Sequence, residues 1–136
     1  PTPPVSRRNR RVPQPPSLGQ WSFRRCEERW GPHTINRFSS GRSVLVRSGR
    51  YNARFWEGEK GNGRCEGIDA FQFDWGVDDE NNWVHPPYRM VGRALGHIRK
   101  CGARATIVLP WWEGQSWWPM VRKQGPTVGG LRTWLV

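Results

Sequence analysis

The stretch from residue 82 to residue 109 constrains the fold of this chain more than any other. A short apolar segment at 82–85 ends at two consecutive prolines, and a nearly continuous apolar segment occupies 104–109, as in strands buried within a parallel sheet. Between them, residues 88–101 place apolar side chains on one helical face and basic side chains on the other, and Gly102 fits a helix C-terminal cap. The pattern predicts a strand–helix–strand unit with parallel strands, and therefore an α/β fold.

The rest of the chain contributes shorter predicted elements. Residues 20–31 carry apolar side chains at helical spacing before a Gly-Pro pair, which predicts a short helix. Residues 33–38 and 43–47 have the β-branched content of strands, whereas the glycine-rich residues 57–67 are predicted to form a loop. A last strand is expected at 131–136, on the edge of the sheet.

Residues 1–19 differ in composition from everything that follows. They hold six prolines and four arginines, so they can neither form a helix nor bury a core. We therefore expect an extended, basic, proline-rich tail at 1–19 and a single α/β domain at 20–136.

The formal net charge of +11 is concentrated in the first part of the chain. Residues 1–56 carry 12 arginines and two acids, whereas residues 57–136 carry ten basic residues and nine acids. Arginine forks match phosphate groups and stack on bases, so a nucleic acid, foremost RNA, is the expected partner. An acidic protein or an acidic membrane surface would satisfy the same charge. The arginines expected to contact nucleic acid are Arg7, Arg8, Arg10, Arg11, Arg24, Arg25, Arg42, Arg47 and Arg50.

Several other classes of protein are disfavoured by the sequence. A membrane span would need about 18 or more consecutive apolar residues, and the chain has no such run. The three cysteines are widely spaced, which fits neither a disulfide framework nor a zinc site, so no metal is expected. The ten tryptophans are expected mainly in the core and in interfaces, because each buries a large area.

Five short motifs follow one another in a distinctive order, namely WGPHTINRF, YNARFW, GIDAFQFDW, NNWVHPPY and ATIVLPWWEGQSWWPMV. In this order they resemble the methyltransferase-like segment that follows the reverse transcriptase and RNase H of DIRS-like retrotransposons. That segment is in turn similar to the phage N6-adenine methyltransferases. The resemblance covers roughly residues 21–121. It implies a Rossmann-like methyltransferase fold, S-adenosylmethionine as cofactor and a DNA adenine as substrate.

The resemblance also implies a set of cofactor contacts. The family has an acid where this chain has Asn36, and an amide accepts a hydrogen bond from a cofactor hydroxyl without the assistance of a charge. Asp69 and Asp74 match acidic positions of the family. These three residues are the expected cofactor contacts if the chain is an active enzyme.

By the same resemblance, the catalytic loop falls on His85, Pro86, Pro87 and Tyr88. In the family the first residue is Asp or Asn, which accepts a hydrogen from the target amino group, and the aromatic residue stacks on the flipped base. A neutral histidine has one acceptor nitrogen and a larger ring. Because the loss of one such hydrogen bond costs about 10²- to 10³-fold in rate, the loop is expected to be vestigial and the chain to need no cofactor.

The expected function is therefore that of a non-catalytic, RNA-binding structural component of a large ribonucleoprotein assembly, such as an organellar ribosome, with neighbouring proteins as further partners. Two alternatives remain open, namely an active S-adenosylmethionine-dependent adenine methyltransferase of a retroelement, and a tryptophan-rich subunit of a protein-only complex. The arginine-rich, acid-poor start is loosely similar to a transit peptide. It favours a mitochondrial or other organellar location, whereas a retroelement enzyme would be nuclear.

Overall fold

The computed structural model describes residues 18–55, 64–124 and 131–135. These residues form a sheet of six strands in the order β3-β2-β1-β4-β5-β6, and every neighbouring pair is parallel. The strands are β1 (Ile35–Ser39), β2 (Tyr51–Ala53), β3 (Cys65–Ile68), β4 (Asn81–Val84), β5 (Arg104–Leu109) and β6 (Leu131–Leu135). Strands and helices alternate through the second half of the chain, so the predicted α/β class is confirmed.

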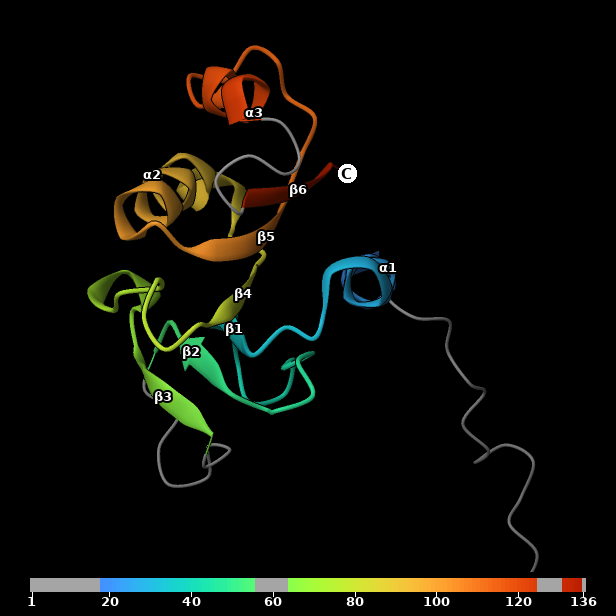
Figure 1. The fold of residues 1–136 in the computed structure, drawn as a ribbon, viewed down its shortest axis with the longest axis vertical. Helices are drawn as coiled ribbons and strands as arrows, with labels where there is room; N and C mark the ends of the chain where they lie inside the picture. Colours follow the sequence, from blue (N-terminus) through green and yellow to red (C-terminus); the bar gives the residue numbers. More distant parts are fainter. Residues whose placement is uncertain (1–17, 56–63, 125–130, 136) are drawn as a thin grey trace, which may run out of the picture.

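Helices cover both faces of this sheet. The described helices are α1 (Leu18–Trp30), α2 (Val91–Cys101) and α3 (Trp118–Gln124), with two short 3₁₀ turns, η2 (Ala70–Gln72) and η3 (Tyr88–Met90). Helix α1 lies on one side of the sheet, whereas α2 lies on the opposite side (Figure 1). Tryptophans at the start of α3 belong to the same apolar cluster as α2, which places both helices over one face.

The alternation of side chains along β4 divides the core into two parts. Val84 packs with the apolar face of α2, in a cluster that also holds Trp75 and Ile107. Its neighbour Trp83 points to the other face and packs with Cys26 of α1. Because successive strand residues point to opposite faces, a strand buried along its whole length contributes to both clusters.

The strand–helix–strand prediction for residues 82–109 is confirmed. Strands β4 and β5 pair in parallel with α2 between them, and Gly102 ends the helix in the left-handed conformation, with φ of 60°. The short helix predicted at 20–31 is α1, the strand predicted at 33–38 is β1, and the edge strand predicted at the C-terminus is β6.

Three local predictions are wrong. Residues 43–47 are not a strand, because Val46 is buried in the α1 cluster from a loop between β1 and β2. Residues 65–67, predicted as loop, belong to β3, and the strand Tyr51–Ala53 has no counterpart among the predicted elements. Helix α1 begins at Leu18, so the last two residues of the predicted tail are helical. The remainder of the tail lies outside the described residues.

We expect Gly76→Ala to destabilise the fold, because a Cβ atom at Gly76 would collide with the backbone carbonyl of Cys101. That carbonyl ends α2 and cannot move without shifting the helix, so the free energy of unfolding should fall by about 2 kcal/mol. Gly96→Ala is the control, because a Cβ atom at this helical position meets nothing within 4 Å. It should stabilise the protein by about 0.5–1 kcal/mol. Urea denaturation of both variants measures the difference, and equal effects would contradict this packing.

Candidate functional site

A cavity of about 640 Å³ opens where the central strands end. Its wall combines residues at or just after the ends of β1, β2, β3 and β4 with residues at the start of α2. In open parallel sheets, ligands bind beyond the carboxyl ends of the strands, where the strand order changes direction. Here that point lies between β1 and β4. The cavity therefore occupies the position at which such a sheet most readily binds a ligand.

Arg37 of β1 places a buried guanidinium in the wall of this cavity. Its Nε donates to Asn82 Oδ1 at 2.7 Å, and its Nη1 donates to Asn52 Oδ1 at 2.8 Å. The guanidinium also lies over the ring of Trp75, 5.6 Å from the centroid. Burial lowers the pKa of Arg37 to about 10, so it stays protonated at neutral pH. Among the described residues it makes no ion pair, and its charge is held by neutral amides.

His85 lies at the junction of three cavities. Besides the large one it lines a second of about 280 Å³ and a third of about 290 Å³. It forms no hydrogen bond with any residue in the described parts of the chain. Although His85 is exposed, the protein around it partly desolvates the ring and lowers the pKa of His85 from its ordinary value, so at pH 7 the ring is mainly neutral. One ring nitrogen is then a donor and the other an acceptor, and both are free for a ligand.

The rest of the predicted catalytic loop surrounds the same junction. Pro86 is buried, whereas Pro87 is exposed, and both line the large cavity. Tyr88 lines the third cavity and packs edge-on against Trp112, with ring centroids 5.6 Å apart. The structure therefore brings His85, Pro86, Pro87 and Tyr88 together around open space.

The predicted cofactor contacts are only partly assembled. Asn36 is buried and lines the second cavity, where its Oδ1 accepts from the Phe38 amide at 3.3 Å. Asp69 lines the large cavity, and its Oδ1 accepts from the Phe71 amide at 3.1 Å as the cap of η2. Asp74 lines none of the three cavities, since its Oδ1 accepts from Gly76 in the turn that leads to β4.

The predicted nucleic-acid arginines fall into separate groups. Arg42 lines the second cavity, Arg47 is exposed on the loop before β2, and Arg24 and Arg25 are exposed on α1. Arg50 lies before β2 and is already paired, at 2.7 Å from Glu66 and 2.8 Å from Glu80. The hydrogen bond to Glu66 raises the pKa of Arg50 above its ordinary value. Arg7, Arg8, Arg10 and Arg11 lie outside the described residues.

A row of exposed aromatic side chains, which we call the aromatic rim, follows the carboxyl ends of three strands. One comes after β2, one after β4 and two after β5, so they surround the same end of the sheet as the cavities. Its members and their exposed fractions are Phe55 at 68%, Tyr88 at 61%, Trp111 at 57% and Trp112 at 43%. Exposed aromatic side chains gathered beside a cavity make this end of the sheet a candidate binding surface.

The two ends of the sheet differ in charge. Among described residues that flank the strands, the carboxyl end carries five arginines and two acids, whereas the amino end carries six basic residues and five acids. The charged residues of the carboxyl end are Arg37, Arg42, Arg54, Arg89, Arg93, Asp69 and Glu113. Those of the amino end are Arg47, Arg50, Arg64, Arg99, Lys100, Arg104, Glu66, Asp74, Asp78, Asp79 and Glu80. The excess of positive charge therefore coincides with the aromatic rim.

Sequence reasoning missed Arg37, Arg54 and Arg93 together with most of the rim. Arg37 reaches the cavity only because β1 lies between β2 and β4, which no local pattern reveals. The Trp-Trp pair at 111–112 could have been noticed, because it directly follows the predicted strand at 104–109.

Two further findings concern the described residues as a whole. No group of three or more His, Cys, Asp or Glu side chains within the described residues could hold a metal ion. None of the helices in this part of the chain is long and apolar enough to cross a bilayer.

Comparisons with known protein families, with curated proteins and with solved structures return no match for this chain.

Proposed function

We propose that this protein binds single-stranded nucleic acid, foremost RNA, at the carboxyl end of its sheet, and does so without catalysing a reaction. The observation that carries the proposal is the aromatic rim beside an excess of arginines. Aromatic faces stack on the bases of unpaired nucleotides, and guanidinium groups neutralise the phosphates, so the combination suits single strands. Bases within a duplex already stack on one another and offer no free face.

The fold proposed for the domain is Rossmann-like, as in methyltransferases. The strand order β3-β2-β1-β4-β5-β6 supports it, because this is the order of doubly wound nucleotide-binding sheets. We propose a reduced version of this fold, because β1 and β2 are joined by a loop and not by a helix. Among the described residues, α2 and α3 are the only helices that connect one strand to the next. A shared fold does not carry an activity with it.

Two features support a non-catalytic role. His85 offers one acceptor where methyl transfer to an amino group uses a carboxylate or amide oxygen. The buried charge of Arg37 in the cavity wall also repels the positively charged sulfonium of S-adenosylmethionine. The overall charge of +11 fits a structural component of a large ribonucleoprotein assembly, and an organellar ribosome is an example of such an assembly.

The proposal is tested by fluorescence anisotropy with a labelled RNA, once as a single strand and once annealed to its complement. We expect the single strand to bind more tightly at every salt concentration, because only unpaired bases can stack on the rim. Tighter binding of the duplex would contradict the proposal, and so would binding of neither form.

We expect titration with S-adenosylmethionine to give a dissociation constant of about 1 mM or weaker. The reason is the buried positive charge of Arg37 in the wall of the cavity where the cofactor would lie. Isothermal titration calorimetry measures this. A dissociation constant below about 0.1 mM would instead favour the alternative of an active retroelement methyltransferase, whose support is the preserved Pro86, Pro87 and Tyr88.

A further inference from the structure

The free side of the Arg37 guanidinium faces the cavity of about 640 Å³. Nε and Nη1 are bound to Asn82 and Asn52, but nothing in the described parts of the chain accepts from Nη2. Nη2 is accessible to solvent, although the Arg37 residue as a whole is only 5% exposed. Its two N–H groups therefore reach the open space of the cavity, held in place by the two amides.

Two further guanidinium groups stand in the same wall. Arg93 lies over the ring of Phe71, 4.0 Å from the centroid, and Arg54 lies over the ring of Phe55 at 5.0 Å. Asp69 is the one acid in the described wall, and it already accepts from a backbone amide. With His85 neutral, three guanidinium groups and one carboxylate give the wall a net charge of +2.

Hydroxyl groups add neutral donors to this basic wall. Ser39, Ser40 and Ser43 line the cavity beside Arg37. Their hydroxyls bond to one another in a chain, with Ser43 Oγ at 3.0 Å from Ser40 Oγ and 3.3 Å from Ser39 Oγ. Hydroxyl groups rotate at little cost and can turn toward an anion. The wall therefore offers both charge and hydrogen-bond donors to a negatively charged ligand.

We propose that this cavity is a phosphomonoester site that accepts the phosphate of a nucleotide. A phosphomonoester carries a charge of about −1.5 to −2 at pH 7, which matches the wall, whereas an internal phosphodiester carries a single charge. The group comes either from a free mononucleotide or from the terminal phosphate of an RNA strand. The second source rests on the proposed function, because the strand would then run from the cavity along the aromatic rim.

Calorimetry with 5′-AMP and with adenosine tests the site itself. Both ligands present the same base and ribose, so their difference reports the phosphate alone. We expect 5′-AMP to bind at least about tenfold more tightly, because charge-assisted hydrogen bonds are the strong ones. Arg54→Gln and Arg93→Gln should each reduce that preference several-fold. Both arginines are exposed, so these variants keep the fold, whereas a change at the buried Arg37 would also remove the hydrogen bonds that join three strands.

Arg104→Gln is the matched control, since Arg104 is also exposed but begins β5 at the opposite end of the sheet. It should leave the preference for 5′-AMP unchanged. Equal binding of 5′-AMP and adenosine would overturn the site, as would the same loss in all three variants.

Anisotropy with one RNA that carries either a 5′-phosphate or a 5′-hydroxyl separates the two proposals. Tighter binding of the phosphorylated strand supports the terminal phosphate as the source. Preference for 5′-AMP with equal binding of both strands assigns the site to free mononucleotides. If the strands bind equally and 5′-AMP shows no preference, the phosphate site fails and the proposed function stands. If neither strand binds but 5′-AMP does, the proposed function fails and the site stands.

Discussion

Replacing Trp111 and Trp112 together by alanine is expected to weaken the binding of single-stranded RNA about 100-fold, because stacking on an aromatic ring contributes about 1–3 kcal/mol per base. Both rings follow the carboxyl end of β5 and are largely exposed, and Trp112 extends the surface of Tyr88. Trp111 is oriented by its Nε1, which donates to Glu113 at 2.9 Å. Anisotropy with a labelled RNA measures the loss, and circular dichroism verifies that the fold remains.

The control for this prediction is Val77→Ala. Val77 is another exposed apolar residue, at 47%, but it lies in the turn before β4 and therefore at the amino end of the sheet. Its removal should leave RNA affinity unchanged. An affinity that is the same in the tryptophan variant and in the wild type would show that the aromatic rim does not bind bases.

Glu27→Ala is expected to lower the free energy of unfolding by about 3 kcal/mol, because it removes the carboxylate that accepts two hydrogen bonds from the buried His33. The carboxylate of Glu27 accepts from the His33 backbone amide at 2.9 Å and from its Nδ1 at 2.8 Å. The other ring nitrogen lies 2.8 Å from Thr106 Oγ1, so this chain of contacts ties α1 to β5. Because Gly19 of α1 lines the second and third cavities, the same contacts support the candidate site.

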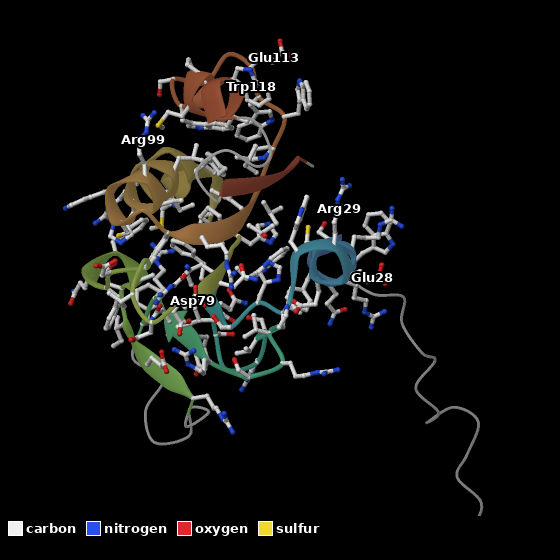
Figure 2. All side chains as sticks on the ribbon, in the orientation of Figure 1. Glu28, Arg29, Asp79, Arg99, Glu113 and Trp118 are labelled. Atoms are coloured by element: carbon white, nitrogen blue, oxygen red, sulfur yellow. The ribbon has the colours of Figure 1, made fainter. Side chains whose placement is uncertain are left out.

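The neighbouring acid provides a matched control. Glu28 lies on the outer surface of α1, away from the sheet (Figure 2). Glu28→Ala removes the same chemical group one residue later, and it should change the stability by no more than about 0.5 kcal/mol. Urea denaturation compares the two variants. Equal losses of stability would mean that the contacts of Glu27 do not hold α1 in place.

The parts of the fold that were predictable are those in which local pattern and tertiary role agree. Helix α2 has a regular apolar face and a glycine cap, and β5 is apolar along almost its whole length. By contrast, β2 has only three residues and β3 contains both Glu66 and Gly67, so neither resembles a strand in isolation. Pairing of β2 with β1 and of β3 with β2 makes them strands, and pairing is a tertiary effect.

The site was predictable only where a motif marked it. The residues from His85 to Tyr88 were expected at the end of a strand, and they lie there beside open space. Charge alone predicted the site less well. Arg50 was expected to contact nucleic acid, but it forms ion pairs with Glu66 and Glu80. The role of Arg37 depends on two amides from neighbouring strands, which are distant in the sequence.

The central claim, that RNA binds at the carboxyl end of the sheet, is tested most directly by the salt dependence of binding in two double variants with the same change of charge. One is Arg54→Gln with Arg93→Gln at the carboxyl end, and the other is Arg99→Gln with Arg104→Gln at the amino end. For single strands, the slope of log K against log salt changes by about 0.7 for each phosphate that the protein no longer neutralises. We expect the carboxyl-end variant to show a slope shallower by about 1.4 and the amino-end variant to keep the wild-type slope. Equal slopes in the two variants, or a change confined to the amino end, would contradict binding at the carboxyl end of the sheet.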